Sequence, residues 1–414
     1  MSWYRLVFIF SMIFSLHCSA KELMAISDDE LIIRGLLYDE YQSYENSRQV
    51  YAKLFDTTKA EVYLFKEATA SLLGRTHLDE SIKRLKTWND LHPDTLESKR
   101  LLIPMYLTTN QVNLAKKQAE YLIERSSTPT DLELASNPFL YTGEFKRALD
   151  LLAKAYEAEH KEVVLFKMVD IMDEYTNEHQ KAIQLLETHR RMYHTDNQVL
   201  AKLLVLYGKE KDIDGLMQTY KALYEQNKSE KILSKIIDTY AYKRDILGAI
   251  EFLEKNQAGD EILYELYKSK KLFQKALGLV EREYKKDKDA KWLAEKGILI
   301  FEKAEDKNDK EMISNVVSNF EKALDLGVDD SIYLNYYGYT LIDKEVNISK
   351  GIKIIEDALT QQPNNTYYLD SLAWGYYKKH KCKKAYKLMK QVVEEEGLEE
   401  EEIIEHWNAI KQCK

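Results

Sequence analysis

A small residue, replaced once by leucine, recurs along the chain at a nearly constant spacing. The steps between consecutive members are 34, 34, 33, 34, 34, 33 and 27 residues. The members are Ser47, Ser81, Ala115, Ala148, Ala182, Leu216, Ala249 and Ala276. A period of this length indicates a repeat array, in which each repeat is one supersecondary unit that buries its apolar face against its neighbours. We therefore expect a stack of similar units instead of several unrelated globular domains.

The residues between these positions favour helices. The 414 residues include only 14 glycines and 5 prolines, so the tight turns of a β-rich fold have few suitable residues. The hydrophobic share of 45% is too high for a disordered chain and is sufficient for a continuous core. The sequence therefore predicts an all-α fold.

The clearest repeat covers residues 366–399 and alternates large and small apolar residues on two helical faces. Its pattern residues are Leu369, Leu372, Ala373, Tyr376, Cys382, Ala385, Met389 and Val392. This pattern resembles the tetratricopeptide repeat (TPR), which consists of two antiparallel helices. The resemblance implies a right-handed α-solenoid of about ten to eleven TPR-like helix pairs.

The preceding repeat begins near Leu334 and ends at Pro363. The joined stretch from Asn335 to Met389 resembles the C-terminal repeats of bacterial exported, periplasmic TPR proteins. We expect residues 21–330 to form degenerate TPR-like repeats and residues 331–398 to form two well-formed TPRs. A capping helix is expected at 399–414, where one apolar stripe consists of Ile403, Ile404, Trp407 and Ile410.

Some repeats depart from the pattern. Pro104 predicts a kink or a shifted helix start in the third repeat, and Pro138 interrupts the fourth. The repeat near residues 257–259 is shortened, and an insertion at 304–312 is expected to lengthen the turn between two helices.

The N-terminus has the pattern of a secretory signal peptide over residues 1–20. Arg5 precedes the uncharged apolar stretch 6–16, and small residues in Cys18-Ser19-Ala20 suit cleavage after Ala20. The stretch is too short to span a bilayer, so a periplasmic or secreted protein without a transmembrane span is expected. Two alternatives are a lipid anchor on Cys18, which His17 makes a poor lipobox, and an uncleaved anchor.

The chain after Ala20 contains two cysteines, Cys382 and Cys413. Because Cys382 opens the second helix of the last repeat and Cys413 ends the antiparallel capping helix, both should lie at the same level. We expect a disulfide between them, as suits an exported protein. The alternative is a small core residue at position 382 and a free thiol at position 413.

The charges indicate what kind of partner the chain could bind. The formal net charge is −9, and acidic and basic residues are mixed along the chain. A concentrated positive footprint is not expected, so nucleic acid is an unlikely class of partner. The acidic run from Glu394 to Glu402 is interpreted as a solvated turn and an acidic helix start.

The sequence contains no phosphate-binding glycine loop, nucleophile elbow or zinc-protease motif, so no enzyme, cofactor or metal is predicted. The TPR resemblance instead implies a concave groove on the first helix of each pair, which would bind a peptide or helix of a protein partner. The corresponding residues are Asn335, Tyr339, Ile342, Tyr367, Asp370, Trp374 and Tyr377. An alternative is that Trp374 and Tyr377 pack within the cap.

The leading hypothesis is a non-enzymatic periplasmic scaffold or adaptor. A second is a lipoprotein-like assembly factor at the outer membrane. A third is an enzyme with a deep polar pocket near Pro104, Pro138 or the insertion. Asn227 and Asn347 also lie in stretches that resemble bacterial N-glycosylation sequons and are expected in loops.

Overall fold

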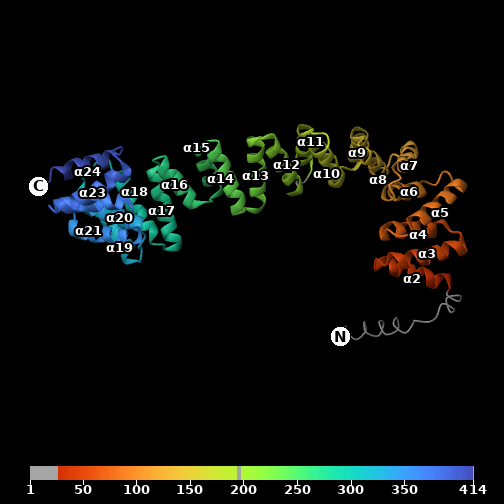
Figure 1. The fold of residues 1–414 in the computed structure, drawn as a ribbon, viewed down its shortest axis with the longest axis horizontal. Helices are drawn as coiled ribbons and strands as arrows, with labels where there is room; N and C mark the ends of the chain where they lie inside the picture. Colours follow the sequence, from red (N-terminus) through yellow and green to blue (C-terminus); the bar gives the residue numbers. More distant parts are fainter. Residues whose placement is uncertain (1–26, 194–196, 414) are drawn as a thin grey trace, which may run out of the picture. The chain divides into compact units, whose positions relative to one another are not determined.

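The computed structural model describes residues 27–193 and 197–413 (Figure 1). Within these ranges all regular structure is helical, and the helices follow one another as antiparallel pairs joined by short turns. The predicted signal peptide and Cys18 lie outside the described residues. The prediction of an all-α array of TPR-like helix pairs is confirmed by eleven pairs and one final helix in the described part of the chain.

The helices divide into two compact units, with the division between Asn227 and Lys228. The first unit has six helix pairs, of which the first helix of each pair is named before its partner. These are α2 (Asp28–Glu40) and α3 (Tyr44–Thr58), α4 (Glu61–Gly74) and α5 (Leu78–Leu91), α6 (Leu96–Thr108) and α7 (Val112–Arg125), α8 (Pro129–Tyr141) and α9 (Phe145–Glu159), α10 (Glu162–Glu174) and α11 (His179–Met192), and α12 (Asn197–Glu210) and α13 (Ile213–Asn227).

The second unit has five pairs and the final helix. The pairs are α14 (Glu230–Tyr242) and α15 (Ile246–Asn256), α16 (Asp260–Ser269) and α17 (Phe273–Asp287), α18 (Lys291–Lys303) and α19 (Lys310–Asp325), α20 (Ser331–Asp343) and α21 (Ile348–Gln361), and α22 (Thr366–Lys378) and α23 (Cys382–Glu396), and they are followed by α24 (Glu401–Lys411). The predicted boundary between residues 330 and 331 falls between α19 and α20, inside this unit.

Each of the eight recurring positions is the fourth residue of the second helix of its pair. Seven of them are buried, because this is where the second helix approaches the first most closely. Leu216 is half-buried, and the close approach in its pair is made one residue earlier by Gly215. A Cβ atom at Gly215 would lie 2.3 Å from the ring of Tyr207.

Glycine has the same role in the pair α20/α21. A Cβ atom at Gly351 would lie 2.6 Å from the backbone oxygen of Gly338, so the two backbones are in contact at this point. Ile355 packs beside them and is fully buried. This pair therefore depends on the absence of side chains at two facing positions.

The irregular repeats fit the array in ways that the sequence predicted only partly. Pro104 lies inside α6, and α6 runs unbroken from Leu96, so the expected shifted start is wrong. Pro138 likewise lies inside α8. The shortening near residue 257 is confirmed by the 11-residue α15 and the 10-residue α16. The insertion lengthens the turn between α18 and α19, which spans residues 304–309.

A partly buried ion pair joins the first helices of two neighbouring pairs in the first unit. The guanidinium of Arg100 in α6 donates to both carboxylate oxygens of Asp131 in α8, at 2.7 and 2.8 Å. Asp131 is 1% exposed, and its backbone N–H donates to the N-cap hydroxyl of Thr128. The hydrogen bonds from Arg100 hold the pKa of Asp131 at about 2.

Among the described residues, no helix has both the length and the apolar character needed to cross a membrane. Of the two sequon asparagines, Asn347 lies in an exposed turn as predicted, where its side chain caps α21. Asn227 is instead the last residue of α13.

Candidate functional site

A cavity of about 300 Å³ lies in the second unit between α18, α20, α22 and α24. Three of these are first helices of their pairs, and the fourth is the final helix. The cavity is lined by Phe301, Glu302, Asn335, Tyr336, Tyr339, Thr340, Asp343, Lys344, Tyr367, Asp370, Ser371 and Glu402. Aromatic rings and carboxylates together form most of its wall.

Four of the seven predicted groove residues line this cavity, namely Asn335, Tyr339, Tyr367 and Asp370. Tyr367 is the most accessible of them, with 51% of its surface exposed. The spacing of the repeat therefore brings these four residues, from α20 and α22, to one surface.

Ile342 does not belong to this surface, which corrects its assignment to the groove. Its side chain is fully buried and points toward Gly351 and Gly375. The two glycines leave a space between the helices, and Ile342 fills that space. It is a core residue of the second unit.

Trp374 is also buried, with 7% of its surface exposed. Its ring is stacked between Tyr377 and His406, with centroid distances of 4.9 and 4.1 Å. Its indole N–H donates to Asp343 Oδ1 at 3.3 Å. Trp374 and Tyr377 thus pack within the cap, the alternative reading of these two residues, and Trp374 is not accessible as a binding anchor.

The helix α24 packs along the face of α22 that the groove prediction described. His406 Nδ1 lies 2.9 Å from Asp370 Oδ2, and Glu400 accepts a hydrogen bond of 3.1 Å from the hydroxyl of Tyr367. Glu402 accepts another from the hydroxyl of Tyr339. The final helix therefore forms one wall of the cavity and covers part of the predicted groove.

The sequence analysis missed the role of His406. Within α24 the fully buried positions are Ile403, His406 and Ile410, whereas Ile404 is 37% exposed and Trp407 is half-buried. The stripe was therefore placed one residue off. The spacing of three and then four residues from Ile403 to Ile410 could have identified the histidine as an inward-facing residue.

The cavity has a negative electrostatic character. Four carboxylates line it (Glu302, Asp343, Asp370 and Glu402), and Lys344 is the cation among its lining residues. Lys344 already pairs with Asp343 at 2.8 Å. Hydrogen-bond acceptors therefore outnumber the positive charges that could neutralise them.

The tyrosines at the cavity remain neutral donors. Burial, together with the nearby Glu302, raises the pKa of Tyr336, whose hydroxyl donates to Glu302 at 3.1 Å. Burial and the hydrogen bond to Glu402 raise the pKa of Tyr339 in the same way. Asn335 Oδ1 is buried and has no hydrogen-bond partner among the described residues. Aromatic walls and acceptor oxygens together suit a ligand group that has an apolar stem and a cationic donor.

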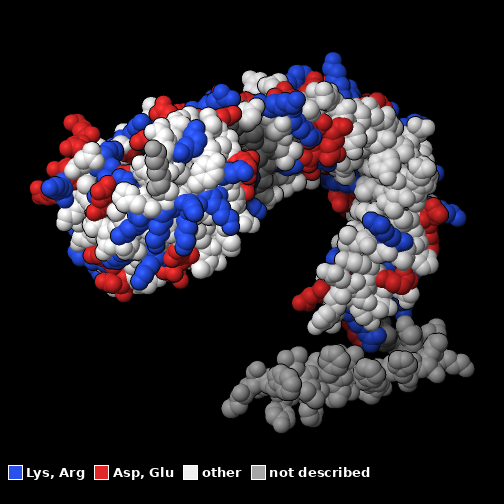
Figure 2. All heavy atoms as spheres, turned by 60° about the vertical axis from the view of Figure 1, so that its left-hand side comes forward, with Lys and Arg blue, Asp and Glu red and all other residues white. Residues whose placement is uncertain are grey.

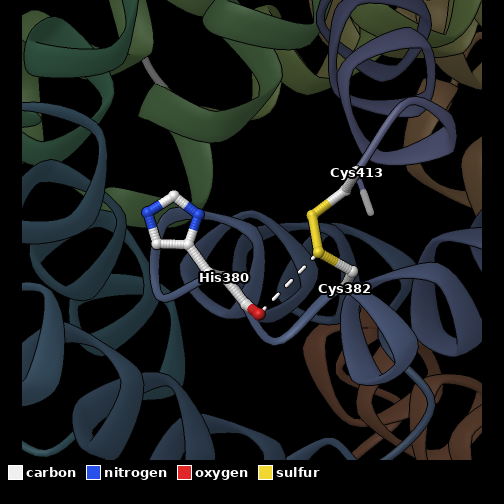
Figure 3. Close-up of a disulfide and its surroundings, with 3 residues drawn as sticks. All are labelled: His380, Cys382 and Cys413. Atoms are coloured by element: carbon white, nitrogen blue, oxygen red, sulfur yellow. Dashed lines mark hydrogen bonds between the residues drawn. A yellow bond between two sulfur atoms is a disulfide. The ribbon is translucent and has the colours of Figure 1, made fainter.

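Cys382 and Cys413 form a disulfide in the structure, and their Cα atoms are 5.4 Å apart (Figure 3). The sulfur of Cys382 also lies 3.7 Å from the backbone oxygen of His380. The bond joins the start of α23 to the residue that follows α24 closely. It therefore holds the far end of the cavity's fourth wall.

The described residues contain no group of three or more His, Cys, Asp or Glu residues arranged to hold a metal ion. No family model and no curated protein matches the chain.

Solved structures with similar helical arrays include Naa15/Naa10 bound to HypK-THB, at 15% identity and a TM-score of 0.35. That match covers 88% of this chain, which spans 63% of the matched one. The Cut9–Hcn1 hetero-tetramer of APC/C matches at 12% identity and a TM-score of 0.38, over 94% and 97% of the two chains. The TPR2AB domain of yeast Sti1 in complex with pHSP90 matches at 16% identity and a TM-score of 0.26, over 69% and 98%. With TM-scores this low, the matches add nothing to the fold, which rests on the helix pairs described above.

Proposed function

We propose that the protein is an exported, non-enzymatic scaffold that binds a segment of a protein partner at the cavity between α18, α20, α22 and α24. The observation that carries this proposal is the convergence of Asn335, Tyr339, Tyr367 and Asp370 on one cavity. Their hydroxyl, amide and carboxylate groups are positioned by the rigid helix pairs beneath them.

The size and charge of the cavity support one kind of contact. A volume of about 300 Å³ accommodates one or two side chains and not a whole helix. Because carboxylates surround it, a lysine or arginine side chain of the partner would find acceptors for its N–H groups and rings for its stem. We therefore propose that the partner inserts a basic side chain and that the adjoining segment lies along the exposed ring of Tyr367.

The test is a cross-linked pulldown from the native cell envelope. The cavity variant combines Tyr367→Ala with Glu302→Gln, because both residues are exposed and neither supports the core. The control combines Tyr242→Ala with Glu305→Gln, which removes the same groups from exposed positions of the same unit that do not line the cavity. A Trp374→Ala variant is unsuitable, because loss of a buried stacked ring would disturb the cap.

We expect the same envelope proteins to be captured by the wild type and the control, and to be lost from the cavity variant. Recovery of those proteins with all three forms would show that the cavity is not their binding site. Capture of nothing specific by the wild type would contradict the scaffold role itself.

A further inference from the structure

The charges of the second unit are not mixed as evenly as the sequence analysis expected. Six exposed lysines gather where the turn between α22 and α23 meets the end of α24. We call them the basic patch, and they are Lys379, Lys381, Lys383, Lys384, Lys387 and Lys411. Figure 2 shows lysine and arginine side chains concentrated on the face of this unit that is turned toward the viewer.

The lysines of the basic patch are not neutralised by acidic neighbours. None of the six forms an ion pair within the described residues, whereas Lys378 beside them pairs with Glu345 at 2.7 Å. The ammonium groups of Lys381 and Lys384 lie over the ring of Tyr376, and that of Lys411 over Trp407. The patch therefore presents its charge to the outside of the molecule.

The placement of these charges does not serve the stability of α23. Lys383 and Lys384 lie in the first turn of α23, and Glu394, Glu395 and Glu396 lie in its last turn. The helix dipole favours the opposite arrangement, because the N-terminal end of a helix is partially positive. A charge pattern that opposes the dipole at both ends points to a partner outside the chain.

Two features indicate that this partner is a membrane surface. The chain contains no arginine after Arg282, so the patch consists only of flexible point charges without the planar groups that recognise a single carboxylate or phosphate. Beside the lysines, Tyr386 is 45% exposed and is stacked on Trp407 at 5.4 Å. Amphipathic rings next to lysines are typical of proteins that lie at the interface of a bilayer.

We propose that the basic patch docks the protein on an anionic phospholipid bilayer, with the aromatic pair Tyr386 and Trp407 at the headgroup level. The acidic end of α23 lies about 22 Å from the basic end, because the helix has 15 residues. This distance exceeds the screening length in physiological salt, so the acidic end does not cancel the attraction. The protein is thus oriented with the turn between α22 and α23 toward the lipid. This inference does not depend on the proposed function of the cavity.

The test is co-sedimentation of the full chain with two kinds of vesicle. One contains phosphatidylcholine alone, and the other contains phosphatidylcholine with about one third phosphatidylglycerol. The patch variant carries Lys379→Gln, Lys383→Gln, Lys384→Gln and Lys387→Gln. The control carries Lys83→Gln, Lys86→Gln, Lys117→Gln and Lys154→Gln, which removes the same charge from exposed positions of the first unit. Circular dichroism melting checks that both variants fold.

We expect the wild type and the control to sediment with the anionic vesicles and not with the neutral ones. Each lysine near an anionic surface contributes roughly a fivefold increase in affinity, so the patch variant should bind about 100-fold more weakly or worse. Raising the salt concentration should release the wild type.

Three results would overturn the proposal. The first is equal binding of the patch variant and the control to anionic vesicles. The second is equal binding of the wild type to both kinds of vesicle. The third is wild-type protein that binds soluble poly-glutamate but not the anionic vesicles, which would assign the patch to an acidic protein.

Discussion

His406 of α24 and Asp370 of α22 form a buried pair, with Nδ1 of the imidazole 2.9 Å from Oδ2 and 3.0 Å from Oδ1 of the carboxylate. The two side chains are 2% and 6% exposed. The imidazole is also stacked on Trp374, so one residue joins the final helix to both the polar and the aromatic part of α22. The position of α24, and with it one wall of the cavity, depends on this contact.

Replacing His406 by alanine should loosen α24. The change leaves the carboxylate of Asp370 buried without its partner, which costs about 2–4 kcal/mol. Hydrogen exchange should show faster exchange of the amides in residues 401–411. Asn408→Ala is the control, because Asn408 is an exposed residue of the same helix. Equal protection of α24 in the two variants would show that the pair does not hold the helix.

The disulfide should be present in the exported protein and should stabilise the cap. Thiol titration of the unreduced, denatured chain that begins at Lys21 should detect no free thiol. Cys382→Ser combined with Cys413→Ser should lower the stability of the last helices by roughly 3–4 kcal/mol, as expected for a loop of this length. Two titratable thiols in the wild type would contradict the pairing.

Gly351→Ala should destabilise the second unit, because the added Cβ atom would lie 2.6 Å from the backbone oxygen of Gly338. Overpacking of this kind costs about 1–3 kcal/mol. Gly278→Ala is the matched control, because the same change in α17 meets no atom within 4 Å. It should stabilise the protein by about 0.5–1 kcal/mol through helix propensity. The two urea midpoints should therefore move in opposite directions, and a shared direction would refute the close contact.

Acid should weaken the contact between α6 and α8. Arg100 holds the pKa of Asp131 at about 2, below its ordinary value of 3.8. The folded carboxyl therefore binds its proton less readily than the unfolded one, and its stabilisation is complete above the unfolded pKa. It is lost as the pH falls from near 4 through 2, and its full size is about 2 kcal/mol.

Asp131→Asn should remove this part of the pH dependence and lower the stability at neutral pH. Hydrogen exchange of α6 and α8, measured at pH 7 and near pH 3, would report both effects. Asp150→Asn provides an exposed carboxyl of the same unit for comparison. An unchanged pH profile in Asp131→Asn would show that the ion pair does not contribute.

The helix pairs were predictable because the close approach of two helices excludes large side chains. That requirement recurs at the fourth residue of each second helix and leaves a period in the sequence. The substitute at Gly215 was not found, because moving the contact by one residue breaks the period without breaking the pair. Pro104 suggested a shifted start for the same reason, since the sequence does not show how α6 runs unbroken through a proline.

The candidate site was predictable only where it follows the repeat. Asn335, Tyr339, Tyr367 and Asp370 were found because equivalent positions of neighbouring first helices share a surface. Ile342 and Trp374 failed because glycines at 351 and 375 and the imidazole of His406 draw these side chains inward. Such contacts depend on what lies across the interface, and the period of a single sequence does not contain that information.

The bond between Cys382 and Cys413 closes a covalent ring over a sequence separation of 31 residues. A pulling force applied to the end of the chain therefore passes through the sulfur atoms to the start of α23 and bypasses α24. The final helix cannot be peeled away while the ring is intact. A processive unfoldase that grips this end must either thread the ring as a doubled strand or wait for a reductant.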